Sequence, residues 1–233
     1  MANIVNNHPE QTLAALLESD AILKSGGLPQ QWNKVADEAT LLRTVEELKK
    51  RNHNVIVVNS RAEAFETVKN LIPNGASVSN GHSTTLEEIG FINYLKDAAQ
   101  WDNFTAKVLS EKDAAKQGEI RRAGYSADYF LSSVSAITED GKFAVADLSG
   151  TRVSGFLPSK HVIIVSGTNK IVKDAEAASK RTYEYALPAE SARARLAYGV
   201  PASQINNFLL IESGFAYAPP RFTIVLVKEQ LGF

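Results

Sequence analysis

The chain contains no cysteine among its 233 residues. This absence excludes disulfide bonds, catalysis by a thiol, and iron–sulfur or zinc sites held by the chain's own cysteines. It is compatible with a reducing compartment. None of the four histidines, His8, His53, His82 and His161, has a metal-ligating residue four positions away, which is the spacing of a metal site on a helix. We therefore predict no metal site, and we expect no cofactor.

The sequence also lacks a surplus of either charge and any long apolar run. Lys and Arg number 25 against 26 Asp and Glu, so no basic excess points to nucleic acid or to a membrane surface. Apolar runs such as 55–58 and 162–165 are far shorter than the roughly 20 residues that span a bilayer. Residues 1–7 carry no basic segment followed by an apolar core, so no secretory signal is expected. We expect a cytoplasmic protein.

The length and composition suit one globular domain with an appendage, because apolar residues make up 44% and charged residues 22%. Residues 1–39 are predicted to be a helical extension, in which Leu13, Leu16 and Leu17 share a helical stripe that Gly26–Gly27 interrupts. Covering the core and contacting a partner subunit both fit this extension. Residues 40–233 are predicted to form the main domain.

The first part of that domain alternates helices with strands. Thr40 is a suitable N-cap for a helix over 41–51, and the continuous apolar run 54–58 is typical of a buried parallel strand. A helix over 61–71 and a strand over 76–79 follow, and 107–109 is expected to be a short strand. This alternation predicts parallel βαβ units.

The second half has a different pattern. Strands are expected over 128–131 and 134–138, and Asp140–Gly141 suits a type I′ hairpin turn before an antiparallel strand over 143–147. A strand over 161–166, a helix over 174–187 closed by Pro188, a short helix over 191–198, and strands over 208–212 and 222–228 complete the prediction. The sequence therefore predicts an α/β fold: a mostly parallel sheet flanked by helices, with antiparallel hairpin additions and a helical N-terminal lead-in.

The segment 79–90, with the sequence SNGHSTTLEEIG, joins a predicted strand to a predicted helix. Helix starts expose unpaired N–H groups with partial positive charge. Gly81 allows a close backbone approach, and Ser83, Thr84 and Thr85 add hydroxyl donors next to His82. This junction is a candidate cradle for a carboxylate or a phosphate.

The sequence of residues 79–90 is equally compatible with a capped helix start that binds no ligand. Thr84 with Glu87, and Thr85 with Glu88, both match the capping box, and His82 is then an exposed turn residue. The segment matches neither the phosphate-binding G-x-x-x-x-G-K-[ST] loop nor the G-x-G-x-x-G fingerprint.

Ligands of open α/β sheets bind beyond the carboxyl ends of the parallel strands. Besides the Gly81 junction, the segments near Ser133 and Lys170 are expected there. Lys170 could neutralise an anion or be a solvated loop residue, and Asn169 could bind a ligand or occupy a turn. Arg193 and Arg195 could line a carboxylate site, although surface arginines are the more ordinary interpretation.

Several motifs in order resemble the lactate-utilisation (LUD) domain family. Residues 81–90 resemble its G-x-S-x-T-L-x-E-x-G segment, and 127–141 resemble its A-D-x-x-x-x-x-x-A-I-x-E-x-G block. A glycine turn at 149–152, a strand ending in G-x-N-K-I-V at 162–172, and the ending 224–233 also match. The resemblance spans roughly residues 40–233.

This resemblance implies a fold similar to the superfamily of glucosamine-phosphate deaminase, ribose-phosphate isomerase and CoA transferase. Matched by position, Gly81, Ser83, Thr84 and Thr85 form the anion loop. Asn169 and Lys170 complete the pocket, and Glu139 becomes the candidate acid or base. On local grounds alone, Glu139 flanks a hairpin turn and needs no function.

Three hypotheses for function follow, the first two implied by the resemblance and the third resting on the N-terminal helices of residues 1–39 as an interface. The first is a LUD-domain protein that binds a small anionic metabolite, a carboxylate or a phosphorylated compound linked to lactate utilisation; whether it is an enzyme stays open. The second is a non-catalytic accessory or regulatory subunit that acts with iron–sulfur redox partner proteins in lactate oxidation. The third is a homo-oligomeric scaffold. Some family members carry a late cysteine cluster, and residues 197–207 here contain none.

Overall fold

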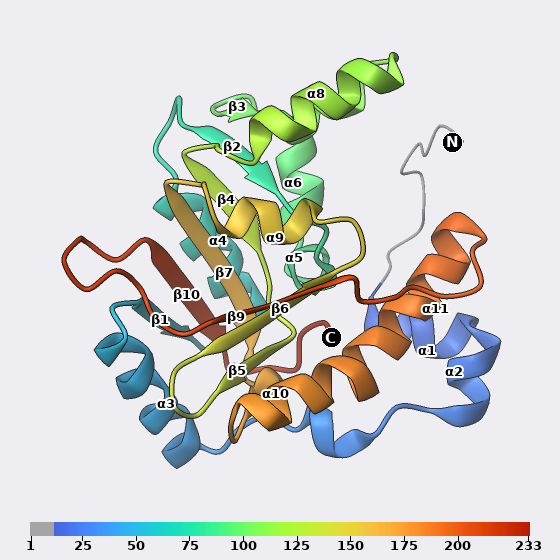
Figure 1. Ribbon diagram of the computed structural model, residues 1–233, viewed down its shortest axis with the longest axis vertical. Helices are drawn as coiled ribbons and strands as arrows, with labels where there is room; N and C mark the ends of the chain where they lie inside the picture. Colours follow the sequence, from blue (N-terminus) through green and yellow to red (C-terminus); the bar gives the residue numbers. More distant parts are fainter. Residues whose placement is uncertain (1–11) are drawn as a thin grey trace.

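The computed structural model describes residues 12–233, so the expectations for residues 1–7 and for His8 lie outside the described part. Its centre is a six-stranded, all-parallel sheet (Figure 1) with the order β1-β10-β7-β4-β2-β3. The strands are β1 (Asn54–Val58), β2 (Ser77–Asn80), β3 (Asp102–Asn103), β4 (Tyr129–Ser132), β7 (His161–Gly167) and β10 (Phe222–Val227). The predicted mostly parallel α/β fold is confirmed.

A second, four-stranded sheet has the order β8-β5-β6-β9. Its strands are β5 (Ala136–Thr138), β6 (Phe143–Asp147), β8 (Ile171–Val172) and β9 (Asn207–Ile211). β6 pairs antiparallel with both β5 and β9, whereas β5 and β8 are parallel. The expected hairpin additions therefore form a sheet of their own, and the last two predicted strands belong to different sheets.

Helices cover both faces of the large sheet (Figure 1). The α-helices are α1 (Leu13–Ser19), α2 (Ala21–Gly26), α3 (Glu38–Lys50), α4 (Arg61–Leu71), α5 (Thr84–Glu88), α6 (Phe91–Asp97), α7 (Phe104–Ser110), α8 (Ala114–Gly124), α9 (Thr151–Phe156), α10 (Ala175–Arg181) and α11 (Leu187–Tyr198). Among the described residues, no helix is long and apolar enough to cross a membrane.

Alternation along the inner strands feeds two cores at once. In β4, Phe130 contributes to the core shared with α3, α9 and the small sheet, while Leu131 contributes to the core beneath α4, α5 and α6. Ile163 and Ile164 of β7 divide in the same way. Strands buried on both faces read as continuous apolar runs for this reason.

The run 54–58 has the composition of an inner strand but occupies the edge of the sheet. β1 pairs only with β10, and only Val58 of its residues is buried. The expectation of a buried strand was wrong because strand order depends on tertiary contacts. The next helix, α4, has the predicted limits, and α3 begins one turn earlier than expected, with Asp37 rather than Thr40 as its N-cap.

The turn between β5 and β6 differs from the expected type I′ geometry. That turn needs positive φ at both central residues, whereas the only positive φ here is +86° at Gly141. A Cβ at this position would also lie 2.6 Å from the backbone carbon of Glu47. Gly141 therefore meets both a left-handed backbone and a close approach to α3.

Two further expectations were wrong. Residues 107–109, expected to be a strand, lie in α7, where the Asn103 side chain accepts a hydrogen bond from the Ala106 N–H and caps the helix. Pro188 does not close a helix. It lies in the first turn of α11, after a π-helical turn (Thr182–Ala186) that connects α11 to α10. Proline is tolerated there because a first-turn N–H needs no helical partner.

The N-terminal helices pack on α11. Leu16 and Leu23 are buried against Tyr185 and Ala189. Asp20 lies between α1 and α2, where its carboxylate accepts two hydrogen bonds from the Arg195 guanidinium, at 2.7 and 2.8 Å. These contacts bring α11, a late segment of the chain, to the same side as the carboxyl end of β2 (Figure 1).

Candidate functional site

Gly81 follows β2 directly and lies close to two other segments, β4 and the start of α9. Its N–H donates to the Leu131 carbonyl of β4. A Cβ at Gly81 would lie 3.1 Å from Cγ of Arg152 and 3.2 Å from Cζ of Phe130. Glycine therefore allows Arg152, at the start of α9, to lie against the loop, in agreement with the expected close backbone approach.

The three hydroxyl residues after His82 have different environments, and all three are buried. Ser83 is the N-cap of α5, where its Oγ accepts from the Leu86 N–H at 3.2 Å. The Thr85 hydroxyl contacts Lys170. Thr84 Oγ1 is buried and has no hydrogen-bond partner among residues 12–233.

The capping-box alternatives were wrong. Ser83, rather than Thr84 or Thr85, caps the helix. Glu88 reaches outward instead: its carboxylate accepts from the N–H of Leu13, in α1, and from the N–H of Gly232. Glu88 thereby ties the first described helix and the last residues of the chain to α5.

Lys170 is fully buried beneath this junction. Its Nζ lies 2.9 Å from Thr85 Oγ1, 3.1 Å from Ser133 Oγ, 3.2 Å from the Val134 carbonyl and 3.0 Å from the Phe233 backbone oxygen. Burial, followed by the nearby guanidinium groups of α10 and α9, holds the pKa of this lysine well below its usual value. Lys170 is therefore a buried donor that joins three segments, and the solvated alternative was wrong.

Asn169 does not point at the junction. Its amide donates to the Asn33 side chain at 2.6 Å, and its oxygen accepts from the Leu231 N–H at 3.1 Å. Both contacts join distant segments of the chain. Its predicted role as a ligand residue stays a prediction.

Five side chains beyond β2 form what we call the polar cluster. His82 follows β2, Glu87 belongs to α5, Arg152 to α9, and Glu190 and Arg193 to α11. Nδ1 of His82 lies 3.6 Å from a Glu87 oxygen, and the Arg152 guanidinium donates to the His82 carbonyl at 2.9 Å. Arg193 donates to both Glu190 oxygens, at 2.5 and 2.8 Å.

Burial shifts the protonation of His82 and Glu87 in opposite directions. It lowers the pKa of His82, and the positive charges of Arg193 and Arg152 lower it further, so the imidazole is neutral at pH 7. The histidine side chain keeps 36% of its surface exposed, but its Nε2 is buried and has no partner among the described residues. Burial raises the pKa of Glu87 to about 7.

Arg193 is buried, so the surface interpretation was wrong for it. Burial opposes ionisation of Glu190, but the hydrogen-bonded Arg193 guanidinium outweighs this and lowers the pKa of that carboxyl. The two charges therefore largely neutralise each other. Arg195 instead forms the Asp20 pair described above.

Arg152 has no such partner. Its guanidinium donates to the carbonyls of His82 and, at 3.4 Å, Ala146, and no carboxylate of residues 12–233 lies within ion-pair distance. The Asp147 carboxylate nearby is engaged by backbone N–H groups at the start of α9 and by the Asn207 amide. Within the described part of the chain, the polar cluster thus contains a cation without a direct ion-pair partner and an uncommitted nitrogen at His82, and the unpartnered Thr84 hydroxyl follows His82 by two residues.

Glu139 lies away from these residues. It follows β5, its carboxylate pairs with Arg43 of α3 at 3.1 Å, and it borders an open hollow of about 560 Å³. Its backbone N–H donates to the Val172 carbonyl at 2.8 Å, so Glu139 lies at the end of the small sheet, and its carboxylate has no contact with the polar cluster. Its role as acid or base stays a prediction.

The polar cluster is suited to binding an anion. No group of three or more His, Cys, Asp or Glu side chains within residues 12–233 could hold a metal ion. The neutral His82 can accept a proton or a hydrogen bond at Nε2, while Arg152 can neutralise a carboxylate or phosphate.

Comparison with known proteins identifies the family. The sequence model of the LUD domain family matches residues 41–227 of this chain. The chain belongs to the LUD-domain family. A crystal structure of a DUF162-family protein from Deinococcus radiodurans has a similar fold, with a TM-score of 0.50 and 12% sequence identity over 83% of this chain and 99% of that one. No curated protein matches the sequence.

Sequence reasoning missed three residues of this LUD domain's polar cluster. Glu87 was assigned to capping, Arg152 was treated only as part of a turn, and Glu190 was not singled out. One available signal was the alanine-rich setting of Glu190 and Arg193 at i, i+3 spacing, LPAESARARLAY. Small residues on every side of a charged pair indicate a closely packed helix.

Proposed function

We propose that this LUD-domain protein binds a small carboxylate or phosphorylated metabolite at the carboxyl end of β2. The observation that carries the proposal is Arg152, which lies beside the loop without a carboxylate partner among the described residues. A guanidinium without a carboxylate partner can bind carboxylate or phosphate oxygens through the donors that its backbone contacts leave available.

The neighbouring groups favour a hydroxylated ligand. A carboxylate at Arg152 brings the rest of the molecule toward His82, whose neutral Nε2 can accept a hydrogen bond from a hydroxyl. Glu87 at Nδ1 favours the tautomer with a free Nε2. L-Lactate has both groups, and the family name links LUD domains to lactate utilisation. L-Lactate is therefore the first ligand to test.

The test is thermal and urea unfolding of the full chain with L-lactate, other hydroxy acids, sugar phosphates and CoA thioesters. A ligand at 100 times its dissociation constant adds about 2.7 kcal/mol to the free energy of unfolding. We expect Arg152→Gln to abolish this gain and Thr84→Val to reduce it, whereas Thr223→Val in β10 leaves it unchanged. Stabilisation that persists in Arg152→Gln contradicts the proposal, as does a panel in which no compound stabilises the protein.

Glu139→Gln is a second control for position. Because Glu139 pairs with Arg43 away from the polar cluster, its substitution should leave ligand stabilisation intact. A loss of binding in this variant supports the acid–base role that the resemblance implies for Glu139. It would shift the site toward the β5–β6 turn.

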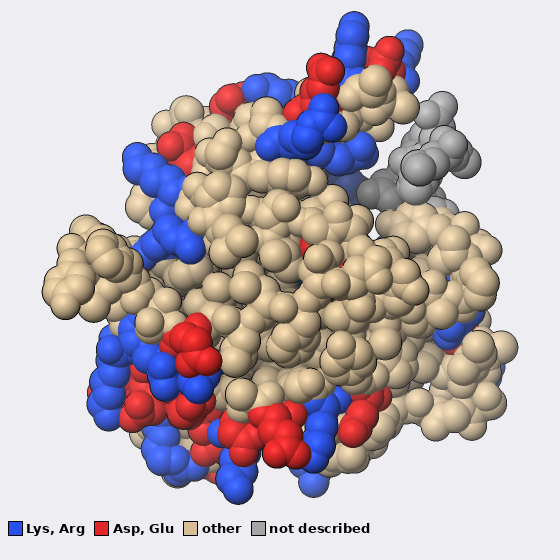
Figure 2. Space-filling view, in the orientation of Figure 1, with Lys and Arg blue, Asp and Glu red and all other residues tan. Residues whose placement is uncertain are grey.

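A role as a subunit of a larger assembly is the second candidate, and an uncharged face supports it. Charged side chains gather at two ends of the view in Figure 2, and the band between them is largely free of charge. β9 lies in this region as an edge strand, with Phe208 39% exposed. Unpaired edges with apolar side chains can pair with another chain.

Solution mass tests this second candidate. The homo-oligomer hypothesis predicts a mass that is a multiple of 25.3 kDa, and Phe208→Lys should return it to the monomer value. Co-purification with redox proteins instead supports the accessory-subunit hypothesis. A monomer without partners contradicts both. The N-terminal helices are a weaker candidate interface, because Leu16 and Leu23 are already buried within the chain.

A further inference from the structure

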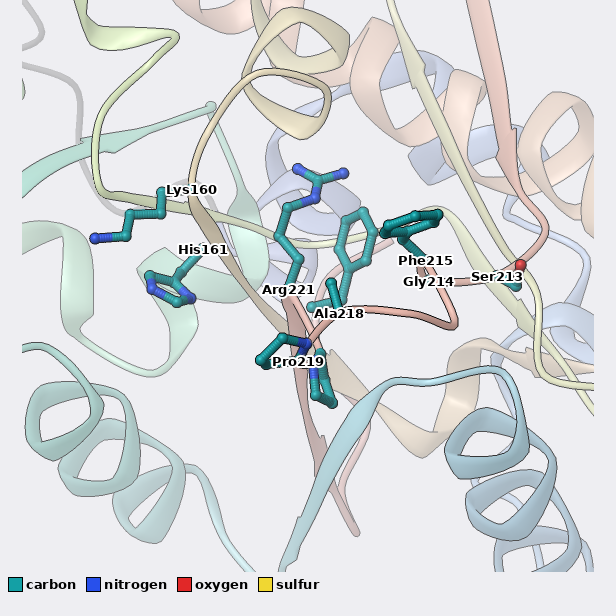
Figure 3. Close-up of a pocket in the computed structure, with 10 residues that line it drawn as sticks. Lys160, His161, Ser213, Gly214, Phe215, Ala218, Pro219 and Arg221 are labelled. Carbon is teal, nitrogen blue, oxygen red and sulfur yellow. The ribbon is translucent and has the colours of Figure 1, made fainter.

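A cavity of about 620 Å³ lies at the opposite end of the large sheet, where β7 and β10 begin (Figure 3). Its floor includes His161 and Phe222, the first residues of those strands. One wall is the loop 213–220, which carries Phe215 and two prolines. This volume is in the range that holds a small organic ligand.

Three nitrogen-bearing side chains line this amino-end cavity: Lys160, His161 and Arg221. No carboxylate is among its lining residues. The Asp128 carboxylate, whose charge acts on His161, accepts hydrogen bonds from both the N–H and the hydroxyl of Ser77. In Figure 3, Arg221 lies between Lys160 and His161 on one side and Phe215 on the other.

Arg221 is held in place by the protein and keeps donors free. One of its terminal nitrogens donates to the carbonyls of Phe156, Leu157 and Ser159, and its guanidinium lies 4.3 Å from the centroid of the Phe222 ring. Its other nitrogens have no hydrogen-bond partner among residues 12–233. A fixed guanidinium with free donors is organised in advance for an anion.

Lys160 and His161 lack side-chain hydrogen bonds and ion pairs within the described residues, and the charge of Asp128 acts on both. Lys160 is exposed and forms no ion pair there, and the His161 ring stacks on Tyr129 at 4.9 Å without a side-chain hydrogen bond. Together with Arg221 they present two positive charges and an imidazole. A phosphate dianion matches this charge better than a single carboxylate.

The remaining wall suits an aromatic ring. Phe215 exposes 70% of its surface beside the cavity. Its loop is anchored, because the Asn52 amide donates to the carbonyls of Phe215 and Ala218 at 2.7 and 3.0 Å. An exposed ring on a fixed loop offers a stacking surface at low entropic cost.

We propose that the amino-end cavity binds a phosphate monoester that carries an aromatic ring, of the nucleoside monophosphate class. Arg221 binds the phosphate, Lys160 and His161 on the other side of the cavity add positive charge, and the ring lies against Phe215. This site is separate from the polar cluster at the other end of the strands.

Isothermal titration of the full chain with AMP, adenosine and inorganic phosphate tests the proposal. AMP should bind, and adenosine should bind at least about tenfold more weakly because it lacks the charge. Lys160→Glu should weaken AMP binding by about tenfold or more, while Lys112→Glu, at another exposed lysine, should not. Phe215→Ala should weaken AMP but leave inorganic phosphate unchanged.

The histidine C–H signals in proton NMR locate the bound ligand. AMP should move the His161 signals, which His161→Gln identifies by their loss, and should raise the pKa of His161 because an anion favours imidazolium. The absence of AMP binding overturns the proposal. Equal affinity for AMP and adenosine, or an AMP response at His82 instead of His161, also overturns it.

Discussion

The two ends of the six-stranded sheet hold their charges in different ways. At the carboxyl end, Lys170 and the Glu190–Arg193 pair are satisfied within the protein, and the free groups at Arg152, His82 and Thr84 lie among them. At the amino end, Lys160, His161 and Arg221 surround an open cavity without an acid. We therefore expect ligand binding and stability to be coupled at the carboxyl end and separable at the amino end.

The largest effect is expected at Lys170, whose amine contacts four oxygens. Lys170→Met removes the donor and leaves buried oxygens unpaired, so we expect a loss of about 3 kcal/mol in the free energy of unfolding. Lys170 binds its proton more tightly in the unfolded chain than in the folded protein, so the free energy of unfolding of the wild type rises with pH toward the usual lysine pKa. The methionine variant lacks this rise, so the stability difference between the two proteins grows with pH. Urea unfolding at several pH values measures both. Lys173→Met, at an exposed lysine, should change stability by less than about 0.5 kcal/mol.

A somewhat smaller loss, about 2 kcal/mol, is expected from Arg193→Met, because the Glu190 carboxylate loses its partner. Adding Glu190→Gln to this variant should restore part of the stability, since the unpaired charge is then gone. A double-mutant cycle by urea unfolding separates the pair from its surroundings. Additive losses would show that the pair contributes nothing beyond its separate contacts.

Glu87→Gln should produce a pH-dependent gain. Because the pKa of Glu87 is raised to about 7, the folded protein holds that proton more tightly than the unfolded chain, and wild-type stability falls between about pH 4.5 and 7. The glutamine variant lacks this fall. It should match the wild type near pH 4 and exceed it by about 1–2 kcal/mol at pH 8. The titration of His82 makes stability rise with pH over part of this range, but it does so in both proteins. A stability difference between wild type and Glu87→Gln that stays constant across this range contradicts the raised pKa of Glu87.

The smallest effect is expected at the amino end. Lys160→Glu should change the free energy of unfolding by less than about 0.5 kcal/mol, because the side chain is exposed and forms no ion pair within residues 12–233. Thermal unfolding without ligand measures this. A loss comparable to that of Lys170→Met would remove the distinction between the two ends.

Local patterns predicted much of the fold. The helix over 61–71 and the strand over 54–58 follow from apolar spacing, and the Gly81 junction follows from the change from strand to helix. Strand order does not follow from such spacing, so the edge position of β1 was missed. The strand prediction for residues 107–109 was wrong because these residues belong to α7, a helix that the Asn103 side chain caps.

Sequence patterns predicted only those residues of the candidate site that lie in one contiguous segment. Gly81, His82 and Thr84 are adjacent in sequence, and their junction could be read directly. Arg152 and Glu190 reach the same place from α9 and α11, more than 60 residues along the chain. Their convergence depends on how α9 packs against β2 and on how α11 packs against α1 and α2, which no local pattern encodes.

The most direct test of the carboxyl-end site is a proton NMR titration of the histidine signals with L-lactate and then with inorganic phosphate. L-Lactate held by Arg152 and His82 should move the His82 signals in a saturable way, while those of His53 and His161 stay in place. Inorganic phosphate, which the amino-end cavity is also expected to bind, should move the His161 signals as well and leave those of His53 unchanged. His82→Asn assigns the signal, and Arg152→Gln should abolish the response. If His82 does not respond to either anion at saturating concentration, the polar cluster is not the binding site.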